Sequence, residues 1–249
     1  MNIDSYLYNG TLVWTMTTNG YKYLTLNLLR TIERAKCPWR LLVVACDKES
    51  YLFFKREGFA VIQYENAQRS NEMAIARWGS PNFRKYNEIK LFLLNKFSKN
   101  ASVKQCIFMD GDIVVFRDFL PDILQRLNTN PETLLFQCDE KDPSPCDISG
   151  CPNCCTGFIA WKQGADKDIF NVNNPEKWNI NRDDQFWVNT ILHEGQHPFQ
   201  TLPRELYPNG AYISDFNKLK EPFLLHFNHR VGNSKIVEMK RLQQWIIPY

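Results

Sequence analysis

The sequence has no block of lysine and arginine, and its 30 basic and 27 acidic residues leave a net charge of only +3. Nucleic-acid-binding surfaces usually show as a basic cluster, so this composition argues against a nucleic-acid partner. The N-terminus lacks a basic segment followed by an apolar one, and no apolar run approaches the length of a transmembrane helix. These absences predict a soluble, cytoplasmic protein that does not insert into a membrane.

A second Cys-x-x-Cys pair is also missing, although the chain has eight cysteines. Cys151 and Cys154 have the spacing of half a zinc site, and Cys138, Cys146 and Cys155 lie close to them in sequence. Structural zinc, a disulfide and reduced thiols are all open for this cluster, and a cytoplasmic location favours reduced thiols. Three other cysteines have apolar neighbours and are expected to be buried free thiols, namely Cys37, Cys46 and Cys106.

Hydrophobic residues make up 44% of the 249 positions, which is enough for one sizeable core. Apolar runs in the first half predict strands at 11–16, 40–46, 60–64 and 106–109, and helices at 21–35, 48–57 and 83–97. The second half is less regular, with expected strands at 134–138, 157–161 and 223–227 and a helix at 183–193. Strands that alternate with helices predict an α/β fold with a mostly parallel sheet covered on both faces. Because no linker interrupts the chain, residues 1–249 are expected to form one domain.

Two aspartates follow the fourth predicted strand, in the order Asp110, Gly111, Asp112. Burying a strand that ends in two acids is costly unless their charge is neutralised. A hard divalent cation neutralises them, and its open side can hold a diphosphate. The alternative is a plain Asp-Gly hairpin turn. A hairpin needs only one acid, whereas the second acid here lies on the same side of an extended backbone.

Four segments resemble, in the same order, those of glycogenin-like glycosyltransferases, which are GT-A nucleotide-diphospho-sugar transferases. The segments are TMTTNGY at 15–21, IFMDGDIVV at 107–115, DDQFWVNTIL at 183–192 and HFNHRVGNSK at 226–235. The resemblance therefore covers residues 15–235. It implies a Rossmann-like GT-A domain with a nucleotide-binding half at about 1–116 and a half for the donor sugar and the acceptor at about 117–249.

The resemblance also implies a role for each matched residue. The donor nucleotide, expected to be UDP, would be held by the first turn, with Thr15, Thr17, Thr18, Asn19 and Tyr21. The metal would be bound by Asp110, Asp112 and His226, and an imidazole beside two carboxylates suits Mn²⁺ better than Mg²⁺. Further contacts to the donor would come from Lys90, Asp110, Gly111, Gly157, Gly232 and Lys235. Asp184 would bind hydroxyls of the sugar, and Gln185 would lie near the anomeric carbon.

Several of these residues have simpler interpretations. His226 lies in an apolar strand and is a candidate core histidine, while His229 competes with it as a metal ligand. Lys90 on a mixed helix is a candidate solvated lysine, and Asp183 is a candidate N-cap. The sequence also departs from the family pattern, because Gly232 and Lys235 are displaced by three residues. The family's asparagine is replaced as well, at Cys155 in Cys155-Thr156-Gly157.

The predicted reaction is transfer of a sugar from a UDP-sugar to a hydroxyl of a glycan or glycoprotein, with retention of configuration. A front-face mechanism fits because Gln185 is a poor nucleophile; an inverting enzyme would need a base such as Asp139, Asp183 or Asp184. One rival is a nucleotidyltransferase that makes nucleotide sugars, but the N-terminal turn lacks its glycine-rich phosphate loop. The other is a non-catalytic sugar- or nucleotide-binding module, which would not need converging acids, histidine and lysine.

Overall fold

The computed structural model describes residues 3–68, 80–139, 153–165, 168–171, 183–195 and 197–248. Within these residues seven strands form one sheet in the order β3-β2-β1-β4-β7-β6-β8. Their bounds are β1 Thr11–Thr17, β2 Leu42–Asp47, β3 Val61–Gln68, β4 Gln105–Met109, β6 Leu134–Cys138, β7 Cys154–Lys162 and β8 Phe199–Thr201. Only β7 runs against its neighbours, so the predicted mostly parallel sheet is confirmed.

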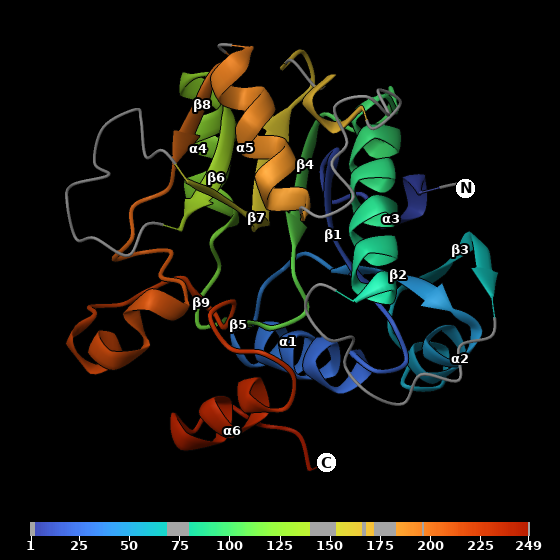
Figure 1. Cartoon of the computed structure of the whole chain (residues 1–249), viewed down its shortest axis with the longest axis vertical. Coiled ribbons are helices and arrows are strands. Elements are labelled where there is room, and N and C mark those ends of the chain that lie inside the picture. The colour runs from blue at the N-terminus through green and yellow to red at the C-terminus, as the bar shows by residue number, and fades with distance from the viewer. Residues whose placement is uncertain are drawn as a thin grey trace.

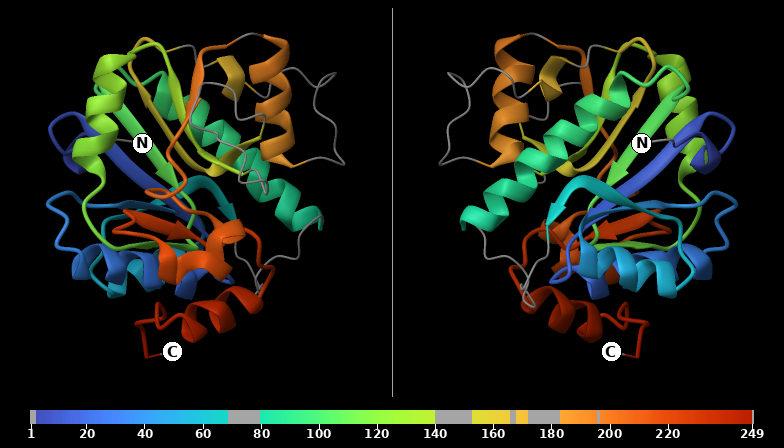
Figure 2. Two further views of the ribbon diagram at one scale, coloured as in Figure 1. Left: turned by 90° about the vertical axis from the view of Figure 1, so that its left-hand side faces the viewer. Right: turned by 90° about the vertical axis from the view of Figure 1, so that its right-hand side faces the viewer.

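Helices cover both faces of this sheet (Figures 1 and 2). The α-helices are α1 Lys22–Arg34, α2 Lys48–Arg56, α3 Pro81–Ser98, α4 Leu120–Thr129, α5 Asp184–Glu194 and α6 Ser234–Arg241. Short 3-10 helices span Asp4–Tyr6, Asp168–Phe170 and Gly210–Lys218. Helices α1, α2 and α4 pack on one face and α3 and α5 on the other, each group over its own cluster of buried side chains.

The central strands are buried at nearly every position because both faces are covered. In β1, Leu12 and Trp14 face the core under α3 and α5, while Val13 faces the core under α1 and α4. Side chains alternate along a strand, so a strand buried on both sides cannot show polar alternation. The unbroken apolar run at the start of β2 has the same cause, and all six residues of the strand are buried.

A second, two-stranded sheet joins distant parts of the chain. Strand β5 Ile113–Val115 pairs antiparallel with β9 Leu224–His226, and Ile113 lies opposite His226. Side chains of both strands pack against α1 and α6 in a third apolar cluster, which includes Leu24 and Met239. The strand predicted at 223–227 is therefore confirmed, whereas β5, β8, α4 and α6 were not predicted.

Side-chain caps fix where three of the helices begin. Asp47 accepts the Ser50 backbone N–H at the start of α2, and Ser80 accepts the Phe83 N–H at the start of α3. Asp183 accepts the Phe186 N–H at 2.9 Å, so its interpretation as the cap of α5 is confirmed. Among the described residues, no helix combines the length and the apolar character needed to cross a bilayer.

Candidate functional site

A cavity of about 330 Å³ opens where β1 and β4 end and the antiparallel β7 begins. Parallel strands place their carboxyl ends at one edge of the sheet, which is where ligands bind in such folds. All the site residues predicted from the sequence line this cavity except Thr15, Asn19 and Asp112. The cavity also takes in residues that the resemblance did not assign, among them Met16, Tyr86, Asn87, Asp139 and Asn228.

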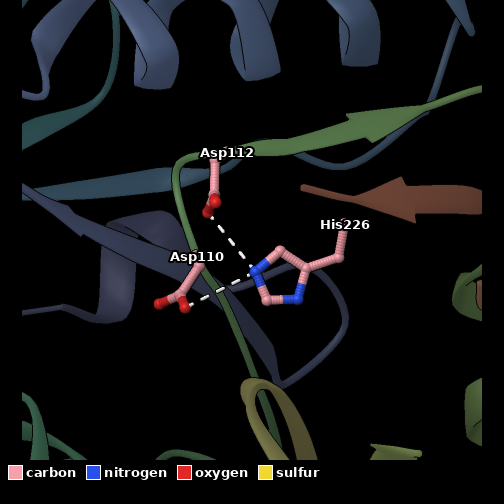
Figure 3. A group of neighbouring side chains, drawn as sticks. All are labelled: Asp110, Asp112 and His226. Carbon is pink, nitrogen blue, oxygen red and sulfur yellow. Dashed lines mark ion pairs between the residues drawn. The ribbon is translucent and has the colours of Figure 1, made fainter. Parts of the chain in front are cut away.

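Two carboxylates and one imidazole converge beside the cavity, and Figure 3 shows how they face one another. Asp110 follows β4 and is held there by its backbone N–H, which donates to the Gly157 carbonyl at 2.7 Å. His226 Nε2 lies 3.4 Å from Asp112 Oδ1 and 3.7 Å from Asp110 Oδ2. One ligand atom from each residue can be chosen so that all three lie within 4.8 Å of one another. His229, the competing ligand, lies apart from this group and contacts Asp139 at 3.1 Å.

The chemistry of this group fits a divalent cation. Asp112 is only 1% exposed, and among the described residues none donates a hydrogen bond to its buried Oδ1. Burial alone would raise the pKa of Asp112, but Lys235 and His226 lower it well below its usual range, so the carboxyl is ionised. A buried carboxylate oxygen that faces a ring nitrogen needs a positive partner. Hard oxygen ligands together with one imidazole suit Mn²⁺ or Mg²⁺.

Lys90, on α3, contacts two acids of the cavity, Asp110 and Asp184. Its Nζ lies 2.8 Å from Asp184 Oδ2 and 3.4 Å from Asp110 Oδ1. Thr156 Oγ1 donates to the same Asp184 oxygen at 2.7 Å. Burial would lower the pKa of Lys90, but the two acids raise it above its usual value, so the lysine is charged. The interpretation of Lys90 as a solvated residue is wrong, because it is 5% exposed.

Lys235, the second residue of α6, reaches across to the first half of the chain. Its Nζ donates to Asp112 Oδ2 and, at 3.0 Å, to the Tyr21 hydroxyl. Burial and Asp112 raise the pKa of Tyr21 far above its usual value, so the hydroxyl stays protonated. Gly232, just before α6, has a φ of +57°, a conformation that glycine adopts without strain.

Gln185 is held by a second polar cluster at the cavity wall. Its Nε2 donates to Asp139 Oδ2 at 2.8 Å and to Asn153 Oδ1 at 3.2 Å. Asp139 Oδ1 also accepts from Asn228 at 2.6 Å and from Asn209 at 2.7 Å. Burial would raise the pKa of Asp139, but these donors and His229 hold it below the usual value. A polar residue directly after a buried strand is the sequence signal that marks Asp139.

Two glycines are needed for space beside Asp110, Asp112 and His226. A Cβ on Gly157 would lie 2.0 Å from His226 Cε1 and 2.8 Å from Asp110 Oδ2. A Cβ on Gly111 would lie 2.4 Å from Thr25 Oγ1. Gly157 and Gly111 therefore let β7 and α1 approach the acids closely, a steric requirement that is independent of any contact with a ligand.

The first turn holds its shape through contacts with neighbouring elements. The Asn19 backbone N–H donates to Asp47 Oδ2 at 2.7 Å, and Lys22 donates to Asn19 Oδ1 at 2.8 Å. Thr15 is fully buried inside β1. Thr17 and Thr18, in contrast, line the cavity. Asn19 and Thr15 thus support the cavity wall, and Asp47 is a supporting residue that the motifs did not indicate.

The cysteines within the described residues divide into two groups. Cys37, Cys46, Cys106, Cys154 and Cys155 are free thiols, and all but the half-buried Cys37 are buried. Burial raises the pKa of Cys46 to about 12. Cys138 is disulfide-bonded, so the expectation of a reduced thiol is wrong there. The proposed zinc spacing includes Cys151, which lies outside the described residues.

Comparison with known proteins gives one family match and several similar folds. The family model described as nucleotide-diphospho-sugar transferase matches residues 39–239. No curated protein matches the sequence. Mouse xyloside xylosyltransferase 1 has a TM-score of 0.56 at 11% identity, over 88% of this chain and 98% of that one. The galactosyltransferase LgtC, solved with donor and acceptor sugar analogs, has a TM-score of 0.55 at 10% identity, over 86% of each chain.

A third similar structure is a glycosyltransferase involved in glycosylation of the major capsid of PBCV-1. Its TM-score is 0.55 at 11% identity, over 94% of this chain and 98% of that one. At such identities the likeness concerns the fold alone. It confirms the predicted class, a GT-A fold with a Rossmann-like, mostly parallel sheet.

Proposed function

Because this chain belongs to the nucleotide-diphospho-sugar transferase family, we propose that it moves a sugar from a UDP-sugar to a hydroxyl group of a glycan or glycoprotein. In this proposal the reaction uses a divalent metal, preferably Mn²⁺, and retains the configuration of the anomeric carbon. The family supports a nucleotide-sugar donor and glycosyl transfer in general terms. The observation that carries the more specific proposal is the convergence of Asp110, Asp112 and His226 beside Lys235 at one cavity.

The donor diphosphate is proposed to lie between this group and α6. Asp110, Asp112 and His226 would hold the metal, which when bound supplies positive charge to the leaving diphosphate. Lys235 adds a second positive charge from the side of Tyr21. Gly232, which lines the same wall, gives the chain before α6 its turn.

The nucleotide is proposed to occupy the end of β1. Thr17, Thr18 and Tyr21 line the cavity there and offer short polar groups and one aromatic ring. Thr15 and Asn19 act behind them, through the strand and the contact with Asp47. In this proposal the chain works as one domain, in which residues up to about 116 bind the nucleotide and the rest bind the donor sugar and the acceptor.

The sugar is proposed to lie between Lys90, Asp184 and Gln185. The Gln185 Nε2 is occupied by Asp139 and Asn153, so its carbonyl oxygen is the polar atom left to face the donor. A neutral amide is a poor nucleophile, and Asp184 is already bonded to Lys90 and Thr156. This favours a front-face reaction: the bond from the anomeric carbon to the diphosphate oxygen breaks, the acceptor oxygen bonds to the same face, and its proton passes to the leaving phosphate oxygen.

The first test is release of UDP from a panel of UDP-sugars that includes UDP-xylose and UDP-galactose, with Mn²⁺ or with EDTA. The panel follows the xylosyltransferase and the galactosyltransferase among the similar folds. We expect metal-dependent turnover of one donor and a loss of at least about 100-fold in Asp112→Asn, because the charge on the leaving group is no longer balanced. Glu132→Gln, which changes an exposed acid away from the cavity, is the matched control.

Two outcomes would contradict the proposal. The absence of turnover and of UDP binding across the panel would exclude the transferase. An inverted product, read from the anomeric proton by NMR, would exclude the front-face reaction and point to a general base among Asp139, Asp183 and Asp184, which all line the cavity.

A further inference from the structure

Gln137 lies behind His226, on the side away from the two acids. It is the fourth residue of β6, and its side chain is completely buried. Its Oε1 is 2.9 Å from His226 Nδ1. Buried amides in proteins almost always have all their polar atoms bonded, so the partners of this amide determine which way it faces.

Two backbone carbonyls fix the orientation of the amide. Gln137 Nε2 donates to the Tyr207 carbonyl at 2.9 Å and to the Pro208 carbonyl at 2.8 Å. If the amide were flipped, its oxygen would face two carbonyl oxygens with no hydrogen between them. The hydrogen-bond network therefore allows only one assignment, in which the Oε1 of Gln137 faces His226.

This orientation selects the tautomer of His226. An amide oxygen only accepts hydrogen bonds, so Nδ1 must carry the ring hydrogen and donate it to Gln137. Cys155 Sγ, which is 3.6 Å from Nδ1, already accepts the Gly157 backbone N–H at 3.4 Å. In the neutral ring Nε2 then carries the lone pair, and Nε2 is the nitrogen that faces Asp110 and Asp112 (Figure 3).

We propose that Gln137 is a positioning residue of the metal site: its carbonyl oxygen keeps the His226 hydrogen on Nδ1 and so presents Nε2 to the metal. The inference rests on the proposed metal-dependent function and extends it from the ligands to the group that orients one of them. Partners of this kind typically change metal affinity by about 10-fold to 100-fold when they are removed.

The first test reads the tautomer directly. The chain has four histidines, so ¹⁵N-histidine labelling gives a simple NMR spectrum, and the His226 signals are assigned by their loss in His226→Asn. In the wild-type protein saturated with Mg²⁺, which is diamagnetic, we expect a hydrogen on Nδ1 and none on Nε2. A hydrogen on Nε2 under these conditions would overturn the proposal.

The second test measures Mn²⁺ affinity by electron paramagnetic resonance without any sugar donor. Gln137→Met keeps the size of the side chain and removes its acceptor, and we expect Mn²⁺ to bind about 10-fold to 100-fold more weakly. Gln105→Met, the same change at the start of β4 and away from the site, should leave the affinity unaltered. Unchanged affinity in Gln137→Met would overturn the proposal.

A double variant separates positioning from loss of structure. In a His226→Ala background, Gln137→Met should weaken Mn²⁺ binding no further, because the ring through which it acts is gone. The melting temperature of the metal-free protein measures the stability lost with the two hydrogen bonds to the Tyr207 and Pro208 carbonyls. It is measured with His226 present and in the His226→Ala background. An equal loss of affinity with and without the ring would show a purely structural role, and if Gln137→Met does not fold, the NMR result decides alone.

Neither measurement uses turnover, so this inference and the proposed function can fail separately. If Mn²⁺ binding depends on Gln137 but no UDP-sugar is turned over, the positioning role holds and the transferase proposal fails. If turnover requires metal but the Nε2 of His226 carries the hydrogen, the transferase proposal holds and the positioning role fails.

Discussion

Lys90 is a buried lysine whose charge is matched by Asp110 and Asp184. Its ammonium also lies 4.7 Å from the centre of the Phe108 ring. Breaking a buried ion pair costs more than the pair contributes, because the remaining charge loses its partner without regaining water. The residues around this lysine therefore make its replacement a test of stability as well as of activity.

We expect Lys90→Met to lower the free energy of unfolding by about 3–5 kcal/mol, because Asp184 keeps a buried negative charge whose remaining side-chain partner among the described residues is the neutral Thr156. Adding Asp184→Asn should restore part of this stability without restoring turnover. Urea unfolding followed by circular dichroism measures both variants. Lys85→Met, at an exposed position of the same helix, is the control, and a similar loss in that control would contradict the explanation.

We expect Gly157→Ala to damage the metal site before it damages the fold. The added Cβ would overlap His226 Cε1, so the ring or β7 must move, at a cost of about 1–3 kcal/mol. Mn²⁺ affinity should fall because His226 is displaced from the two acids. Calorimetric titration with Mn²⁺ and the melting temperature of the metal-free protein separate the two effects. Wild-type Mn²⁺ affinity in this variant would contradict the geometry.

At the scale of elements, Asp47 connects a helix start to the first turn. Its Oδ1 accepts the Ser50 N–H at 2.8 Å, and its Oδ2 accepts the Asn19 N–H at 2.7 Å. One side chain therefore caps α2 and holds the turn between β1 and α1. The cap affects the stability of the fold and the turn affects the nucleotide site, so the two losses can be separated by measuring unfolding and UDP affinity.

We expect Asp47→Ala to cost about 1 kcal/mol through the lost cap and to weaken UDP binding through the freed turn. Ser80→Ala removes the cap of α3 without touching Asn19, so it should cost a similar stability and leave UDP affinity near the wild-type value. Thermal unfolding and fluorescence titration with UDP measure both quantities. An equal effect of the two variants on UDP affinity would show that Asp47 acts through general stability.

At the scale of the molecule, the site is assembled from segments far apart in the sequence. Strand β5 follows the two acids, and β9 brings in His226 from the other end of the chain. Lys235 then crosses from α6 to Asp112 and Tyr21. A ligand that binds at this junction should stabilise both halves together.

We expect UDP at about 100 times its dissociation constant to stabilise the Mn²⁺-loaded protein by about 2.7 kcal/mol more than Mn²⁺ alone, which corresponds to a rise in melting temperature of about 5–10 °C. Differential scanning fluorimetry measures the shift. EDTA should abolish most of it, and Asp112→Asn should show little. An equal shift with UDP and EDTA would contradict the role of the metal.

The sequence by itself determined the mostly parallel sheet, the main helices of the first half and the two closely spaced acids of the proposed metal site. These depend on local signals: apolar runs, caps such as Asp183, and the close spacing of Asp110 and Asp112. Local signals act over a few residues, so they can be read without knowing the path of the chain.

Only the tertiary structure decided which partners the site residues take. It placed His226, and not His229, beside Asp110 and Asp112. It also buried Lys90 against two acids and brought Asp139 and Gln137 to the site. These outcomes depend on pairing between β5 and β9 and on the junction of β6 with β7, where each contact joins residues distant in the chain. The spacing of apolar residues along the sequence does not predict such contacts, because they arise from packing of whole elements and from the need to satisfy buried polar groups.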